Sequence, residues 1–264
     1  MKELLIKKIL VCTALFLVLI LMLAACSNSS SRGNILRVGV DDSYPPMEFK
    51  DESGNMVGFD VDLGKEIAKR LNMKIEYIST AWDGIFTALA AEKFDTIISS
   101  LSITDERKKN IAFTRAYIAN AQVIVVSPSN NSILTEKDLK GKVVGVQINT
   151  TAEEACKKFM KDTPFKELKT YDQVIQPFSD LKTGRLDAVV ADEVVARDYV
   201  SKDKANYKVA GGRLTNEPIG IGFKKTNTAL RDKIDKVLGE MRQDGTLKSI
   251  SMKWFGEDLT SNVK

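Results

Sequence analysis

The sequence predicts an α/β fold with a mostly parallel sheet, repeated in two lobes. Short apolar strands alternate with amphipathic helices, as in α/β proteins. The pattern restarts midway: "LRVGV" (36–40) resembles "KVVGV" (142–146), and "EKFDTIISS" (92–100) resembles "GRLDAVVAD" (184–192). With 264 residues and 44% hydrophobic residues, the chain is long enough to build a core in each lobe.

The N-terminus has the layout of a bacterial lipoprotein signal. A basic start is followed by an apolar run over 9–25 and then by Cys26 within "LAAC". We expect 1–25 to be a cleaved signal peptide, Cys26 to be the lipidated, palmitate-bearing new N-terminus, and 26–34 to be a flexible tether. The alternative is an uncleaved membrane anchor, for which the apolar run is short.

The first lobe is predicted element by element. Asn55 and the preceding Gly54 mark a hairpin turn, and Asp60 is a plausible cap for the helix that follows it. The pattern predicts strands over 35–40, 74–78 and 95–99, and helices over 61–71 and 82–92.

The chain then leaves this lobe and returns. A strand over 121–126 crosses to the second lobe, a strand over 219–225 belongs to the return, and the tail over 230–254 is helical. Two crossings predict a hinge, with ligands beyond the carboxyl ends of the strands. We therefore expect lobe 1 over 35–120 plus 216–264, and lobe 2 over 121–215.

Composition excludes several classes of function. The net charge is +4 with no long basic run, which disfavours nucleic acid. The chain has no histidine, so the commonest general base and metal ligand is missing. Cys156 lies in a helical run with Ala152 and Phe159, which is typical of packing. No phosphate loop or metal cluster is recognisable, and we expect no cofactor and no metal.

The stretch "TIISSLSITDERKKN" (96–110) holds the strongest site signal. Thr104 can cap a helix that begins at Asp105, and Arg107 stands where a capping box has Glu or Gln. Arg107 could simply pair with Asp105 or Glu106 on the surface, which stabilises little. Alternatively it faces an anion, because its planar guanidinium suits a carboxylate. Hydroxyl groups follow the same strand at Ser99, Ser100 and Ser102.

These motifs resemble the extracellular solute-binding proteins of family 3, which serve polar amino-acid ABC transporters. The resemblance rests on "VGVDDSYPPMEF", "GFDVDLGKEIAKRL", "DTIISSLSITDERKKNIAFT", "KGKVVGV", "GRLDAVVAD" and "DGTLKSISMKWFG", in this order over the whole mature chain. It implies a two-lobed Venus-flytrap fold of type II, with two mixed sheets joined by a two-strand hinge. It also implies a monomer that binds one free amino acid outside the cell and delivers it to the permease subunits.

The resemblance also assigns the amino-acid backbone contacts. Arg107 would clamp the ligand's α-carboxylate with the Ser102 N–H, helped by Thr150 and Thr151 at a helix start in lobe 2. The residue before these threonines is Asn149, where the family commonly has glycine. Asp192 would accept the α-ammonium, with Ser100 adding to it. The alternatives are that Thr151 and Asp192 only cap the helices that follow them.

The resemblance places Tyr44 and Trp82 on opposite sides of the ligand's side chain. Without it, such aromatic residues are more often core. Asp41, at the end of the first strand, could reach the far end of a long side chain, or could serve only turn chemistry in "DDSYPP". Aromatic rings attract cations, so arginine, lysine or histidine is the expected ligand, with glutamine next.

Two other classes of function use the same fold. One is an exported dehydratase of small ring acids, for which Asp41 or Asp192 would have to act as general acid or base. The other is a sensor domain of a receptor or channel, which would need a separate partner because no further span or signalling domain is recognisable. We expect a binding protein and not an enzyme.

Overall fold

The computed structural model describes residues 34–261 and 263, and residues from Leu36 onward form one compact unit. The signal peptide over 1–25, Cys26 and nearly all of the tether lie outside the described residues. No described helix is both long enough and apolar enough to cross a bilayer.

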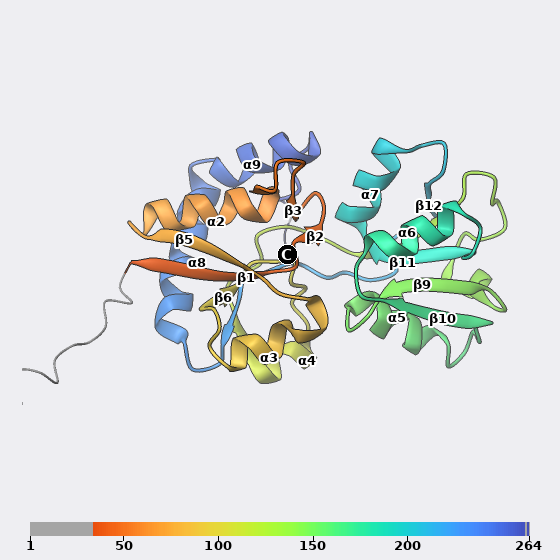
Figure 1. The fold of residues 1–264 in the computed structure, drawn as a ribbon, viewed down its shortest axis with the longest axis horizontal. Coiled ribbons are helices and arrows are strands. Elements are labelled where there is room, and N and C mark those ends of the chain that lie inside the picture. The colour runs from red at the N-terminus through yellow and green to blue at the C-terminus, as the bar shows by residue number, and fades with distance from the viewer. Residues whose placement is uncertain (1–33, 262, 264) are drawn as a thin grey trace, which may run out of the picture. The chain divides into compact units, whose positions relative to one another are not determined.

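Two five-stranded mixed sheets organise the fold (Figure 1). We call lobe 1 the part built on the first sheet and lobe 2 the part built on the second. In order across the first sheet, the strands are β5 (Lys74–Ser79), β1 (Ile35–Val40), β6 (Thr96–Ile97), β13 (Gly222–Lys224) and β7 (Ile111–Phe113). In the second they are β10 (Glu167–Tyr171), β9 (Val143–Gln147), β11 (Ala188–Asp192), β8 (Gln122–Val126) and β12 (Lys208–Ala210).

The two sheets share one plan, which explains the internal similarity of the sequence. Strand β1 pairs in parallel with β6, and β9 pairs in parallel with β11. The fourth strand of each sheet is antiparallel to the third, and it is β13 in lobe 1 and β8 in lobe 2. Each of these antiparallel strands lies next to a chain segment that crosses between the lobes. The sheets are therefore mixed and not mostly parallel.

Helices cover both faces of each sheet. Lobe 1 carries α2 (Phe59–Arg70), a 3-10 turn η1 (Trp82–Gly84), α3 (Ile85–Ala90), α4 (Asp105–Asn110), α8 (Thr228–Gln243) and α9 (Thr246–Phe255). Lobe 2 carries a 3-10 turn η2 (Glu136–Leu139), α5 (Thr151–Phe159), α6 (Ile175–Lys182) and α7 (Glu193–Lys202). A small antiparallel sheet of β2 (Ser43–Tyr44), β3 (Glu48–Lys50) and β4 (Met56–Val57) adds to lobe 1.

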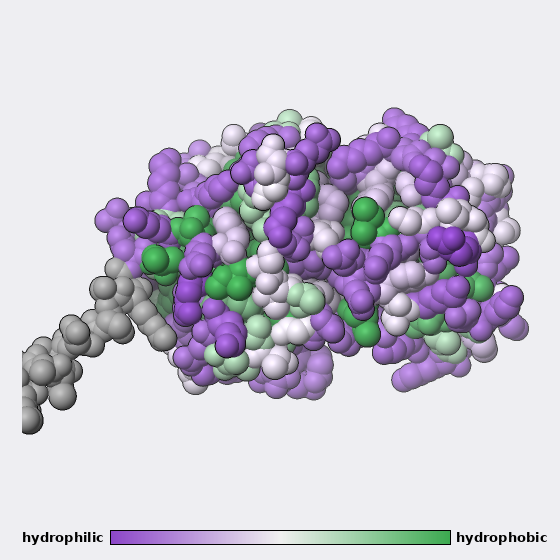
Figure 2. Space-filling model, viewed as in Figure 1, coloured by the Kyte–Doolittle hydropathy of each residue, from purple (hydrophilic) through white to green (hydrophobic). Residues whose placement is uncertain are grey.

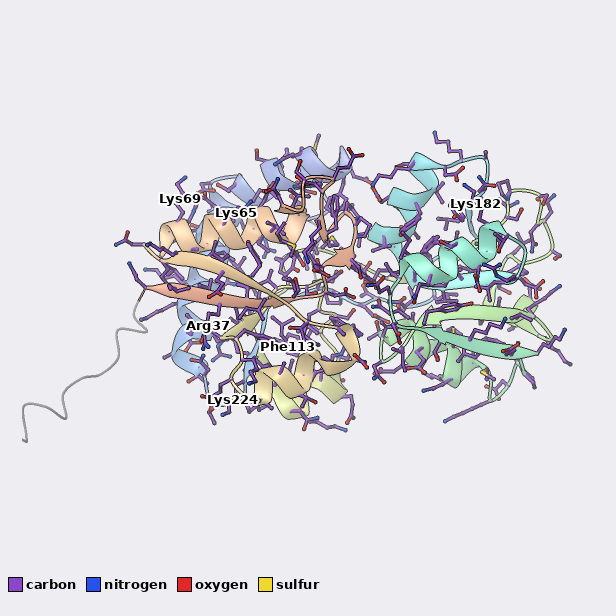
Figure 3. All side chains as sticks on the ribbon, viewed as in Figure 1. Arg37, Lys65, Lys69, Phe113, Lys182 and Lys224 are labelled. Atoms are coloured by element: carbon purple, nitrogen blue, oxygen red, sulfur yellow. The ribbon has the colours of Figure 1, made fainter. Side chains whose placement is uncertain are left out.

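Alternation along the strands builds separate apolar layers. In lobe 2, Val123 and Val125 pack with α6 and α7, whereas Ile124 and Val126 pack with Cys156 of α5. Cys156 is buried, as a packing residue should be. Charged side chains such as Lys65 and Lys69 of α2 point outward (Figure 3). The visible surface is correspondingly hydrophilic, with only small apolar patches (Figure 2).

Two neighbouring segments connect the lobes. One runs from β7 to β8 and the other from β12 to β13. They pair as antiparallel strands, with a bridge between Ile118 and Ile219 and a bond from the Glu217 N–H to the Asn120 carbonyl at 2.9 Å. This is the two-strand hinge of the type II fold. The exact lobe boundaries at 120/121 and 215/216 stay a prediction.

Three expectations about elements were wrong in detail. Asp60 does not cap α2, because the cap position is Gly58 and Asp60 is buried inside the first turn. The predicted helix over 82–92 begins as the 3-10 turn η1. The helical tail is two helices, because Gly245 adopts a left-handed conformation with φ 81°.

Candidate functional site

A cavity lies between the two lobes, at the carboxyl ends of strands from both sheets. Its lining includes nine of the ten residues expected from the sequence: Tyr44, Trp82, Ser99, Ser100, Ser102, Arg107, Thr150, Thr151 and Asp192. The tenth, Asp41, does not line it. Residues that are far apart in the chain thus meet at one place.

Arg107 is a buried cation that forms no ion pair with any acid in residues 34–261 and 263. Its backbone N–H donates to the Thr104 hydroxyl at 3.1 Å, so Thr104 caps α4 as predicted. The guanidinium donates to the Ser102 carbonyl at 3.1 Å and lies over the Trp82 and Phe86 rings. None of the ion pairs among the described residues includes Arg107. Burial lowers its pKa, which reflects the cost of a desolvated charge.

The surface alternative for Arg107 is wrong, because other side chains take its nearby acids. Lys108 pairs with Asp105 at 3.3 Å, and Lys109 pairs with Glu106 at 2.5 Å. Arg107 itself is only 9% exposed. The guanidinium is therefore available to an anion inside the cavity, and a carboxylate matches its geometry.

Asp192 is a buried acid with no cationic partner among the described residues. It ends β11 and occupies the position before α7, but its side chain makes no capping bond. Its oxygens accept hydrogen bonds from four neutral donors: the Tyr44 hydroxyl, Asn120 Nδ2 and Gln122 Nε2, each at 2.7 Å, and the Ser100 hydroxyl at 3.4 Å. Burial raises the pKa of Asp192. A carboxylate held by neutral donors suits an ammonium group, and the capping alternative is wrong.

The loop of lobe 2 adopts a left-handed conformation at Asn149, with φ 57°. Asparagine tolerates this conformation better than most residues with a side chain, so the departure from glycine is accommodated. The cap of α5 is Thr150, whose hydroxyl accepts from the Glu153 N–H at 3.3 Å. The alternative in which Thr151 caps the helix is therefore wrong. Thr151 is instead the first helical residue, and its hydroxyl accepts from Gln122 Nε2 at 3.0 Å.

The two aromatic residues reach across the cleft. Trp82 Nε1 donates to the Asn149 carbonyl at 3.0 Å, and the Tyr44 hydroxyl donates to Asp192. Both side chains line the cavity and are mostly buried. They are therefore site residues as well as packing residues, and they join lobe 1 to lobe 2.

Asp41 serves the turn after β1. Its Oδ1 accepts from the Ser43 N–H at 3.3 Å and from the Ser43 hydroxyl at 2.7 Å. Its Oδ2 accepts from Gln147 Nε2 of lobe 2 at 2.8 Å. The turn chemistry is thus present. Asp41 contacts the cavity lining through Gln147 and through its own backbone N–H, which donates to the Ser99 hydroxyl at 3.0 Å.

Sequence reasoning missed Glu48, Gln122 and Gln147, which all line the cavity and are buried. Gln147 ends the apolar strand β9 just as Asp192 ends β11, so the same rule could have found it. Gln122 and Glu48 begin their strands, where a single polar residue gives no signal of burial.

Comparison with known proteins identifies the family. Residues 36–257 match the model for bacterial extracellular solute-binding proteins, family 3. The chain belongs to this family. It is 35% identical to the L-cystine-binding protein TcyJ of Escherichia coli K12 over 230 residues, which cover 87% of this chain and 85% of that protein. It is 36% identical to the histidine-binding periplasmic protein of the same strain over 231 residues, covering 85% and 88%.

Solved structures show the same two-lobed fold. An ancestral arginine-binding protein bound to arginine is 45% identical, with a TM-score of 0.81, and the match covers 85% of this chain and 99% of that one. An ancestral amino acid-binding protein, a precursor of cyclohexadienyl dehydratase, is 38% identical, with a TM-score of 0.78 and coverage of 84% and 96%.

Proposed function

We propose that this protein binds a free polar or cationic L-amino acid outside the cytoplasm and delivers it to an ABC importer. The observation that carries the proposal is the pair of buried charges in one cavity: among the residues that the structure describes, neither Arg107 nor Asp192 forms an ion pair. An amino acid supplies both missing partners, with its α-carboxylate for Arg107 and its α-ammonium for Asp192. Arginine, lysine or histidine is favoured and glutamine is next.

Further contacts follow from the same placement. The Ser102 N–H, Thr150 and Thr151 would add to the carboxylate site, and Ser99 and Ser100 would line its lobe 1 side. Tyr44 and Trp82 would flank the ligand's side chain. The relatives support this reading, because proteins that bind cystine, histidine and arginine share the fold and a third or more of the sequence.

The proposed location is the outer face of the cell membrane, with a lipid anchor on Cys26 and a monomeric mature chain. The sequence pattern around Cys26 supports this proposal. Intact-mass spectrometry of the mature N-terminus tests it, because a free N-terminus upstream of Cys26 would contradict it.

A dehydratase is less well supported. Its candidate acids from the sequence were Asp41 and Asp192. Asp41 does not line the cavity, and Asp192 accepts hydrogen bonds from four donors. A general acid or base needs access to the proton that it transfers. Recovery of the bound amino acid in unchanged form would favour binding over turnover.

The experiment that tests the function is a thermal-shift screen. The purified protein is unfolded and refolded to remove carried-over ligand, and is then mixed with each of the twenty free amino acids. A ligand at a hundredfold excess over Kd adds about 2.7 kcal/mol, which for a chain of this size raises Tm by roughly 5–11 °C. We expect such a shift with arginine, lysine or histidine. No shift with any amino acid would contradict the proposed function.

A further inference from the structure

A second group of acids lies in lobe 1 beside the cavity. Glu48 lines the cavity and is fully buried, and Asp60 of α2 is fully buried as well. Among the described residues, no lysine or arginine forms an ion pair with either of them. Buried carboxylates without a cation are costly, so this group needs another source of compensation.

The hydrogen bonds leave one carboxyl oxygen of this group without a partner among the described residues. Glu48 and Asp60 are neighbouring buried acids, and the charge of Asp60 raises the pKa of Glu48. A proton on one of them removes the repulsion between two like charges. Asp60 accepts from the Ser100 N–H and from the Tyr117 hydroxyl, both at 2.7 Å. Glu48 accepts at Oε1 from the Ser99 hydroxyl at 2.6 Å, and Oε2 receives no hydrogen bond from the described residues. Glu48 Oε2 is therefore the oxygen of the pair that is free to carry a proton.

The surroundings agree with this assignment. The groups that face Glu48 are Asp60 on α2, Asp41 after β1, Tyr44 on β2 and Tyr117 in the hinge, and none of them is a cation. Burial, and then the Asp60 carboxylate, raise the pKa of Glu48 well above its ordinary value. The pKa of Asp60 rises to about 6, chiefly because of burial.

We propose that Glu48 and Asp60 share one proton in the ligand-free protein and release it when a cationic side chain enters the cavity. This inference rests on the proposed function. If Arg107 and Asp192 take the ligand's backbone charges, the acid at Glu48 is left over for the side chain. A proton balances that acid without ligand, and a guanidinium or ammonium replaces the proton on binding. The balance is Glu48–COOH plus cation giving Glu48–COO⁻ paired with the cation, with H⁺ passing to solvent.

With this proton exchange, one site binds neutral and cationic side chains in two different ways. A neutral side chain binds while the proton stays on Glu48. A cationic side chain binds with release of the proton, so only its affinity rises with pH. Other acids near the cavity, such as Asp192, affect both ligands alike, and their contribution cancels when arginine and glutamine are compared.

Calorimetry at pH 6 tests the proposal. Arginine and glutamine are each titrated into the refolded protein in two buffers of different ionisation enthalpy. We expect arginine binding to release about one proton and glutamine binding to release about none. The Kd for arginine should fall up to about tenfold per pH unit while the pair is still protonated. Histidine is avoided because its own side chain titrates in this range.

Variants separate this role from a structural one. Glu48→Gln removes the exchangeable proton, and should abolish the proton release and weaken arginine at least tenfold while leaving glutamine within about threefold. Glu52→Gln, in an exposed loop, is the matched control and should behave as wild type. Equal loss of both ligands in Glu48→Gln would contradict the selective role.

The wild-type titration alone decides the matter if Glu48→Gln does not fold. Arginine binding without buffer-dependent heat would overturn the proton exchange and leave the proposed function intact. If only neutral amino acids bind, the proton exchange is also overturned, and the proposed function stands. Failure of every amino acid to bind would overturn both.

Discussion

At the scale of single residues, the distinctive feature of the site is that its buried charged side chains form no ion pairs among the described residues. Burial of an ion normally requires a partner, because the energetic cost of desolvation is several kcal/mol. Neither group forms an ion pair within the described part of the chain: Arg107 contacts the Ser102 carbonyl and two aromatic rings, and Asp192 accepts from neutral donors. A protein that keeps two such groups in one cavity is prepared for a ligand that carries both complementary charges.

Replacing Arg107 should remove binding of every amino acid. Arg107→Ala leaves the ligand's carboxylate unpaired in a buried site, which costs about 2–5 kcal/mol or roughly 30-fold or more in Kd. Arg107→Lys keeps the charge but loses the planar guanidinium. Its affinity for amino acids should therefore lie between those of the wild type and Arg107→Ala. Calorimetric titration measures the change.

The matched control is Arg185→Ala, because Arg185 is exposed and pairs with Asp180 in lobe 2. It should bind as wild type. Normal affinity in Arg107→Ala would show that the carboxylate assignment is wrong.

Polar residues that follow an apolar strand could be predicted as site residues from the sequence, whereas acids at the start of another strand or helix could not. Arg107, Ser102 and Asp192 follow apolar strands, and a polar residue at that place points to a site. Glu48 and Asp60 look like ordinary surface acids in a hairpin and a first helical turn. Their burial depends on the packing of α2 against the small sheet, which no local pattern reports.

At the scale of elements, the loop before α5 shows how backbone conformation prepares the site. Asn149 at φ 57° lets its carbonyl accept from Trp82 while its N–H donates to Glu153 Oε2 at 2.8 Å. Both contacts use the backbone only. The side chain at 149 therefore matters chiefly through the conformations that it permits.

This loop gives a stability prediction. Asn149→Ala keeps every backbone contact but places a less tolerant residue in the left-handed region, and should lower the free energy of unfolding by about 1 kcal/mol. Asn149→Gly permits the conformation and should change stability by less. Urea denaturation measures both. If the alanine variant is as stable as wild type and the glycine variant is not, the conformational argument fails.

Element boundaries were harder to predict than element types. The strand over 35–40 agrees with β1, whereas the strand over 95–99 shrinks to Thr96–Ile97. The chain leaves regular geometry there because Ser100 takes a φ of 43° and turns its N–H toward Asp60. Local propensity could not reveal this, since the cause is a buried carboxylate from a distant helix.

At the scale of the whole described unit, two sheets of one plan face a shared cavity across a paired hinge. Contacts such as Trp82 with Asn149 and Gln147 with Asp41 join the lobes directly. A ligand held by Arg107 from lobe 1 and Asp192 from lobe 2 would stabilise the arrangement in which these contacts between the lobes are made. The reason is that the ligand makes all of its contacts only when both lobes reach it. The sequence predicted the two lobes through the internal similarity, but not the strands that each crossing adds to the sheets.

We propose that one free amino acid is captured between the lobes by its two backbone charges. The most direct test is a calorimetric titration of the refolded protein with L-arginine and then with L-argininamide, which keeps the side chain and ammonium but lacks the carboxylate. The account predicts binding of L-arginine and at least roughly 30-fold weaker binding of the amide. Equal binding of the two, or no binding of L-arginine or any other amino acid, would contradict it.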